Sequence, residues 1–264
     1  MLDICSSILI HVNLMDFRSW SEITGFDSCR DIQKDIHMSN LRDLAKEITD
    51  KLPTEREKAI ALHDYVRDNI KFGLNRYFDL SRPDNTLDIG IGHCNPNTEL
   101  MTELFRQVDI EAYIHFVVLP KQILKGAVSP NRYWLIPEQL SHSYTEVKVD
   151  GNWHNIDSYI LDIPLFRAAK AKLSKEGLTI GYGAHIHSTI HWDGKSDAFS
   201  QFDNDMMLED HGRVDNLDSY YSSNRYCHKV FGVRLNTLFR IMGKSLEARS
   251  KLYLDKLRQQ YSEN

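Results

Sequence analysis

The sequence lacks the features that mark several functional classes. It has no C-x-x-C pair, and its four cysteines stand far apart, which fits neither a zinc knuckle nor a dense disulfide framework. We therefore expect a reducing compartment and a cytoplasmic protein. A net charge of −5 leaves no basic stripe for a phosphate backbone, so nucleic acid is not an expected partner. The cysteines are Cys5, Cys29, Cys94 and Cys227.

Long hydrophobic runs are absent as well. The one apolar stretch near the start, ICSSILIHVNLM at residues 4–15, is too short to span a membrane and contains His11 and Asn13. It also lacks the basic segment and the small-residue cleavage site of a signal peptide. We expect a buried strand or helix there and no membrane partner. No internal repeat, low-complexity tract or linker divides the chain, so its 264 residues can bury a full core.

Helical spacing is present on both sides of Pro53. Residues 39–52 show it, and Pro53 then stops that helix. Thr54 and Glu57 form a capping box at the start of a second helix, whose apolar stripe continues to about residue 70. Residues 73–92 are rich in turn formers, so we expect a loop that leads to Cys94.

Another helix is predicted directly after Cys94, in the segment GIGHCNPNTELMTELF at residues 90–105. Asn95 suits the N-cap, Pro96 suits the first helical position, and apolar residues recur at helical spacing beyond them. The free N–H groups and the positive dipole end of a helix N-terminus favour a thiolate. Cys94 is therefore a candidate nucleophile, the alternative being an inert packing thiol. Its backbone N–H is a candidate oxyanion donor, with His93 as a candidate side-chain donor.

The following segments predict strands. Residues 113–119 (YIHFVVL) form a near-continuous apolar run, as expected for a strand buried on both faces. Residues 141–157 (SHSYTEVKVDGNWHNID) predict a hairpin around Asp150 and Gly151, because Asp-Gly suits a two-residue type I′ turn. With that turn, His142 and Asp157 share a face as diagonal neighbours, with backbones about 7 to 8 Å apart.

A cysteine that transfers acyl groups needs a base that takes and returns its proton, and a third group that orients the base. Cys94, His142 and Asp157 can fill these roles. The chain resembles the transglutaminase-like superfamily, whose core has a helix-terminal Cys, a His in an H-x-x-x-E-V strand and a W-x-x-x-D strand. Within residues 55–160 these elements are GHCNPNTELMTELFRQVDIEAYIHFVV, HSYTEV and WHNID. Tyr144 stands where the family often has Trp, and Asp109 stands where a Gly usually follows the cysteine helix.

The resemblance implies an α+β fold. Its papain-like, transglutaminase-type core has an antiparallel sheet packed on the cysteine-bearing helix, and we expect a helical C-terminal extension. The predicted parts are an N-terminal helical or irregular segment (1–52), the transglutaminase-like catalytic core (53–165) and C-terminal strand and helices packed on the core (166–264), either within the same domain or as an appendage.

The resemblance also implies a papain-like catalytic triad. Cys94 is then the nucleophile, His142 the general base and acid, and Asp157 the group that orients the imidazole. The implied activity is acyl transfer on amide or ester bonds, as in a cysteine peptidase, an amidase or a transglutaminase. It proceeds through a thioester on a protein or peptide substrate and needs no cofactor.

Two other functions are open on the sequence. If GAHIHSTIHWD at residues 183–193 is a strand, three imidazoles and the Asp193 carboxylate share one face and could bind zinc in a metal-dependent hydrolase. The three histidines are His185, His187 and His191. The same face could also simply meet solvent or line the cleft. The second alternative is a non-catalytic binding module that keeps the transglutaminase-like fold.

Overall fold

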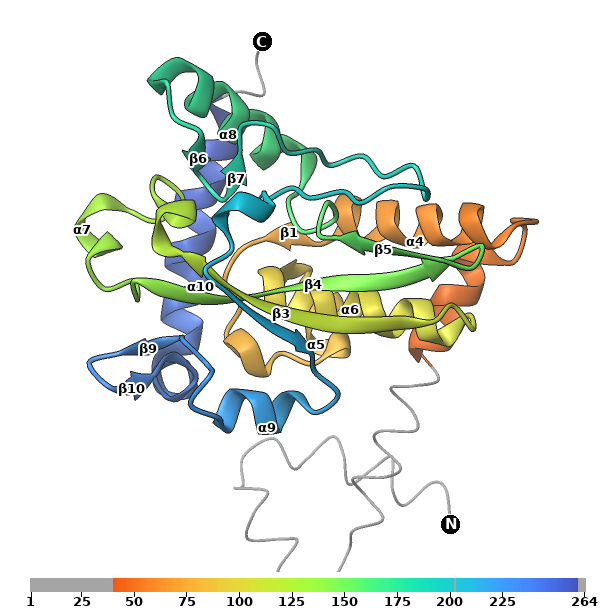
Figure 1. Ribbon diagram of the computed structural model, residues 1–264. Helices are drawn as coiled ribbons and strands as arrows, with labels where there is room; N and C mark the ends of the chain where they lie inside the picture. Colours follow the sequence, from red (N-terminus) through yellow and green to blue (C-terminus); the bar gives the residue numbers. More distant parts are fainter. Residues whose placement is uncertain (1–39, 202, 261–264) are drawn as a thin grey trace, which may run out of the picture. The chain divides into compact units, whose positions relative to one another are not determined.

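The structure is a computed structural model, and it describes residues 40–201 and 203–260 (Figure 1). The apolar stretch at residues 4–15, predicted to be a buried strand or helix, lies outside the described residues. The first described helix covers residues 40–49, and α4 (Glu55–Asn69) follows Pro53. The predicted capping box is present, because Thr54 Oγ1 accepts from the Glu57 N–H and the Glu57 carboxylate accepts from the Thr54 N–H.

The central element is an antiparallel sheet with the strand order β5-β4-β3-β8. Its strands are β3 (Ala112–Pro120), β4 (Gln139–Val149), β5 (Asn152–Ile156) and β8 (Glu209–Arg213). β3 confirms the strand predicted at 113–119. Because β8 comes from late in the chain, the C-terminal part completes the same sheet.

β4 and β5 form the predicted hairpin. Asp150 and Gly151 have φ values of 49° and 82°, as a type I′ turn requires. Val149 pairs with Asn152 and Thr145 with Ile156, which is the register that the Asp-Gly turn predicts. Asp157 directly follows the last paired residue of β5, and so it leaves the sheet on the side where β4 carries His142.

The cysteine-bearing helix α6 (Cys94–Gln107) packs against β3 and β4. Its apolar stripe is fully buried, and each such side chain stabilises the fold by about 1.5–3 kcal/mol. The stripe consists of Leu100, Met101, Leu104 and Phe105. The N-cap is His93 rather than the predicted Asn95, because the Asn95 amide is turned away to hydrogen-bond Asp79.

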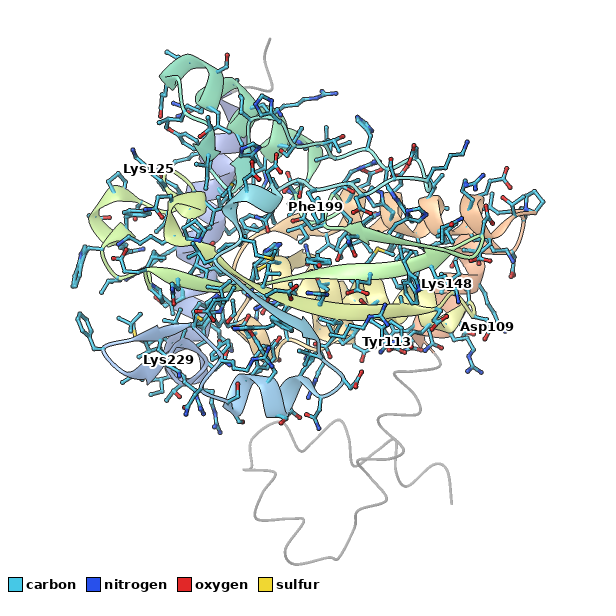
Figure 2. All side chains as sticks on the ribbon, viewed as in Figure 1. Asp109, Tyr113, Lys125, Lys148, Phe199 and Lys229 are labelled. Carbon is cyan, nitrogen blue, oxygen red and sulfur yellow. The ribbon has the colours of Figure 1, made fainter. Side chains whose placement is uncertain are left out.

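Asp109 occupies the family's glycine position after α6 with a left-handed backbone, φ 61°. It lies at the edge of the molecule near Tyr113 and Lys148 (Figure 2). Aspartate tolerates this conformation better than most residues other than glycine, which explains how the departure is accommodated.

The segment before α6 is more regular than the predicted loop. It contains β1 (Lys71–Phe72), the 3-10 helix η1 (Phe78–Leu80), α5 (Pro83–Ile89) and β2 (Ile91–Gly92). Pro83 starts α5 at a position where a proline costs no hydrogen bond, and Gly90 ends it with φ 66°. The prediction of a loop was therefore wrong for residues 83–89.

After β5 the chain continues mainly through helices. These are α8 (Ile163–Glu176), α9 (Leu217–Ser222) and α10 (Leu235–Gln259). Short elements lie between them or precede β4: η2 (Lys121–Leu124), α7 (Pro130–Tyr133), β6 (Ile180–Gly181), β7 (Ala184–His185), η3 (Asn204–Met206), β9 (Lys229–Val230) and β10 (Val233–Arg234). The α+β fold with a helical C-terminal extension is thus confirmed.

A buried ion pair fastens α10 to the core. Arg258 donates to the Asp162 carboxylate at 2.6 and 2.9 Å and to the Phe72 carbonyl at 2.7 Å. Asp162 also caps α8 by accepting from the Leu165 N–H at 3.1 Å. One guanidinium therefore joins α10, α8 and β1. Within the described residues, no helix is long and apolar enough to cross a membrane.

Candidate active site

Cys94 is the first residue of α6, so its sulfur lies among the N–H groups of the first helical turn. The backbone N–H groups of Ser143 and Asn95 donate hydrogen bonds to the sulfur. The side chain is partly exposed and lines a cavity. The thiol is therefore reachable from that cavity, as a nucleophile must be.

The environment of Cys94 does not favour the thiolate. Burial raises the pKa of the thiol above its ordinary value, and the carboxylates of Asp79 and Asp157 raise it further. The two backbone N–H donors lower the pKa but do not outweigh these causes. The sequence prediction was right about the helix terminus, but burial and the two carboxylates shift the pKa of the thiol in the opposite direction to the one predicted.

The structure brings His142 and Asp157 together. His142 Nε2 lies 3.0 Å from Asp157 Oδ2, and both side chains are buried. The opposite carboxylate oxygen, Oδ1, accepts from the Ser200 N–H and Oγ and from the Gln201 N–H. Ser200 and Gln201 thus hold Oδ1 of Asp157, while Oδ2 orients the imidazole of His142.

His142 and Cys94 line the same cavity. β4 carries the imidazole and α6 carries the sulfur, and these two elements pack against each other. The three residues predicted from the motifs therefore converge at one end of the sheet.

A second buried carboxylate, Asp79, was missed by the sequence analysis. It accepts from His93 Nε2 and His228 Nδ1, both at 2.8 Å, from Asn95 Nδ2 at 2.7 Å and from the Tyr226 hydroxyl. Burial works to raise the pKa of Asp79, but the charges and hydrogen bonds of His228 and His93 hold it far below its ordinary value. We call Asp79 and its four donors the Asp79 cluster.

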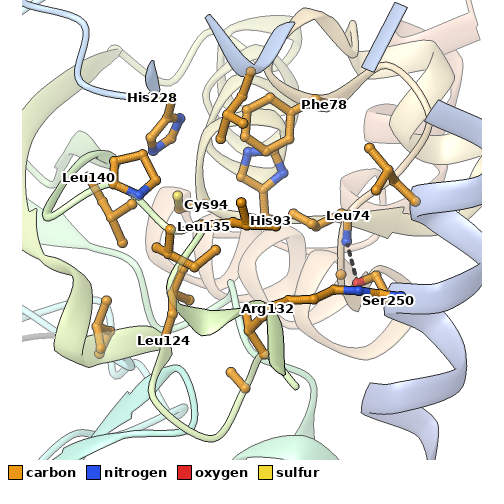
Figure 3. Close-up of a pocket in the computed structure, with 18 of the residues that line it drawn as sticks. Leu74, Phe78, His93, Cys94, Leu124, Arg132, Leu135, Leu140, His228 and Ser250 are labelled. Carbon is orange, nitrogen blue, oxygen red and sulfur yellow. Dashed lines mark hydrogen bonds between the residues drawn. The ribbon is translucent and has the colours of Figure 1, made fainter. Parts of the chain in front are cut away.

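The Asp79 cluster surrounds the first turn of α6. His93 and His228 line the cavity together with Cys94 (Figure 3). The His93 ring stacks on Phe78 with centroids 4.7 Å apart, which fixes its orientation. His93 thus lines the same cavity as Cys94, and its role as an oxyanion donor stays a prediction.

The cavity beside Cys94 has a volume of about 290 Å³. Its walls come from β1 and η1, from the segment between β3 and β4, and from α10. Most side chains in these walls are aliphatic or aromatic, and none of the described residues that line the cavity is an aspartate or a glutamate. Figure 3 shows Cys94 between His228, Leu140 and Leu135.

The predicted histidine strand does not form. Only Ala184 and His185 are in a strand, and the chain then turns, because Lys170 Nζ gathers the carbonyl oxygens of His185, Ile186 and Ser188. His185, His187 and His191 consequently do not share a strand face. Across residues 40–201 and 203–260, no three His, Cys, Asp or Glu side chains are grouped to hold a metal ion.

The comparisons with known proteins agree with the motifs. Residues 42–158 match the family model of the transglutaminase-like superfamily. One similar solved structure is described as "a Putative Cysteine Protease from Cytophaga hutchinsonii": it is 19% identical with a TM-score of 0.35, covering 45% of this chain and 36% of that chain. Another, described as a TGase, is 18% identical with a TM-score of 0.34, covering 53% and 35%.

This chain therefore spans about a third of the length of those two structures. No curated protein matches it significantly. The family match extends over the helix of Cys94 and the strand of His142 and ends directly after Asp157. The resemblance drawn from the motifs is confirmed by the match of residues 42–158 to the transglutaminase-like superfamily model.

Proposed function

We propose that the protein is a thiol-dependent acyl-transfer enzyme that acts on amide or ester bonds. Cys94 is the nucleophile, His142 is the general base and acid, and Asp157 orients the imidazole. One observation carries this proposal: the His142–Asp157 pair, 3.0 Å apart, lies at the wall of the cavity that Cys94 also lines. The transglutaminase-like core supports the same assignment.

The hydrogen bond between His142 and Asp157 suggests which ring nitrogen of His142 carries the proton. A carboxylate only accepts hydrogen bonds, so the Asp157 oxygen requires the proton on Nε2. Nδ1 is then the nitrogen that exchanges a proton with the sulfur. In this proposal that proton moves to Nδ1 as the sulfur attacks the substrate carbonyl.

The reaction then has two halves. The Cys94 sulfur adds to the substrate carbonyl while its proton passes to His142 Nδ1. The oxyanion that forms accepts a hydrogen bond from the Cys94 backbone N–H. His142 returns the proton to the leaving amine or alcohol, whose bond to carbon breaks and leaves a thioester. In the second half an acceptor gives its proton to His142 and attacks the thioester, and the sulfur is released and reprotonated.

The acceptor distinguishes the members of this class. Water gives a peptidase, amidase or esterase, whereas an amine gives a transglutaminase. Both fit the two-step scheme, and the first half is the same for both. A test of the first half therefore tests the proposed function without knowledge of the acceptor.

Acylation by p-nitrophenyl acetate provides that test. We expect a burst of nitrophenol and an acetyl group on Cys94, located by peptide mass spectrometry. The burst should disappear in Cys94→Ala and fall by ~100-fold or more in His142→Ala. Cys227→Ala is the matched control, since Cys227 is the other free cysteine within the described part of the chain, and it should keep the burst. Acetylation at an unchanged rate in His142→Ala would contradict the proposed role of the imidazole.

A further inference from the structure

The cavity beside Cys94 is much larger and more apolar than acyl transfer itself requires. Many of its lining side chains are aliphatic and form a leucine-lined wall from two separate segments: Leu124 and Leu135 come from the segment between β3 and β4, and Leu238 and Leu246 come from α10. A space enclosed by such side chains is unfavourable for water and favourable for hydrocarbon.

Polar side chains line part of the cavity. Cys94, His142 and the two histidines of the Asp79 cluster are among them. Gln201 is also a lining residue, and its backbone N–H donates to Asp157. The carbonyl and leaving group of a substrate would lie beside Cys94 and His142, the two groups that react with them.

The charges on the cavity walls further restrict which acyl groups can bind. Over residues 40–201 and 203–260, the side chains that line the cavity include two arginines, Arg132 and Arg249, and no carboxylate. A cationic acyl group, such as one carrying an ammonium, would therefore enter without a counter-charge. A glutamine side chain would fill only a small part of the space and leave the rest of the leucine-lined wall uncovered.

We infer that the acyl donor carries an apolar acyl group, which lies along the leucine-lined wall while its carbonyl lies at Cys94. The cavity, with a volume of about 290 Å³, leaves room for several carbons beyond that carbonyl. This inference rests on the proposed function. It narrows the substrate from amides and esters in general to those of aliphatic acids.

The first test compares p-nitrophenyl esters of acetate and octanoate on the full chain. Each methylene group that moves from water into the cavity should increase kcat/KM severalfold. We therefore expect kcat/KM for the octanoate ester to exceed that for the acetate ester by ~100-fold or more. Leu246→Trp fills the cavity from α10 and should reduce this preference at least ~10-fold. Leu252→Trp on the exposed face of the same helix is the matched control and should leave the preference as it is.

The second test measures binding without catalysis. Decanoate should bind to the Cys94→Ala variant in isothermal titration calorimetry, and Leu246→Trp in that background should weaken the binding. If Cys94 is acetylated but acetate and octanoate react equally and decanoate does not bind, the inference about the acyl chain fails while the proposed function stands. If decanoate binds but no ester acylates Cys94, the proposed function fails and the cavity is a fatty-acid binding site.

Discussion

Replacing Asp157 with asparagine preserves the shape of the side chain. It can place an NH2 donor where the carboxylate presents an acceptor to His142. In the native protein Oδ1 accepts from the Ser200 N–H and Oγ and from the Gln201 N–H, whereas Oδ2 faces His142 Nε2. Three donors fix the asparagine oxygen at the Oδ1 position. The asparagine NH2 group then occupies the Oδ2 position and donates toward the imidazole.

This exchange inverts the tautomer of His142. Nε2 must accept from the new NH2 group, so the proton moves to Nδ1, the nitrogen that takes the proton of Cys94 in the proposed reaction. We expect the acylation rate of Cys94 to fall by ~10⁴-fold, which corresponds to about 5 kcal/mol of transition-state stabilisation. The free energy of unfolding should fall by only about 1–2 kcal/mol, because the three bonds to the remaining oxygen persist without the charge.

Two assays separate the outcomes. Acylation by p-nitrophenyl octanoate at pH 7 gives the rate, and nitrogen-15 NMR of the histidine side chains shows which ring nitrogen of His142 carries the proton. Asp197→Asn is the matched control, since this exposed carboxylate lies in the segment before Ser200 and accepts from the Asn155 N–H. A folded Asp157→Asn protein that keeps more than about a tenth of the rate would refute the orienting role of Asp157.

Two further predictions concern the charges buried around the core. Alkylation of Cys94 by iodoacetamide should increase with pH through an apparent pKa above that of a free thiol, because burial and the Asp79 and Asp157 carboxylates raise the pKa of the sulfur. Asp79→Asn removes one of these charges and should speed the alkylation at pH 7, as read by peptide mass spectrometry; an unchanged or slower rate in the folded variant would contradict the electrostatic account. Arg258→Met leaves the buried Asp162 carboxylate without its counter-charge. It should lower the free energy of unfolding, measured with urea, by about 3–5 kcal/mol. Asp218→Asn, which breaks only the exposed pair with Arg82, should lower the free energy of unfolding by less than about 1 kcal/mol, and equal losses in the two variants would contradict the argument.

Local chemistry made the hairpin and its consequence predictable. A type I′ turn fixes the register of the strands on both sides, and Asp-Gly specifies that turn through its two positive φ values. Once the register is known, the side on which Asp157 leaves the sheet follows without further information. The contact with His142 could therefore be expected from the sequence.

The Asp79 cluster could not be predicted in this way. Tyr226 and His228 lie 147 and 149 residues from Asp79 in the chain, and no turn or periodicity connects them. Asn95 illustrates the same limit, because its sequence context suits an N-cap and yet the buried carboxylate takes its amide. The histidine strand failed for a similar reason, since Lys170 of α8 gathers three carbonyls from that segment.

The Asp79 cluster also bears on how the thiol is activated. A helix N-terminus alone would lower the pKa of Cys94, but the same first turn adjoins a buried carboxylate, whose charge acts in the opposite direction. A sulfur that stays protonated resists oxidation and alkylation while the cavity is empty. Because an apolar acyl group would displace water from the cavity, the proton transfer to His142 and the attack on the carbonyl would then occur together. Under this mechanism Cys94 reacts faster with an ester that fills the cavity than with iodoacetamide. The ratio of these two rates should exceed the ratio that a free thiol in water gives with the same two reagents.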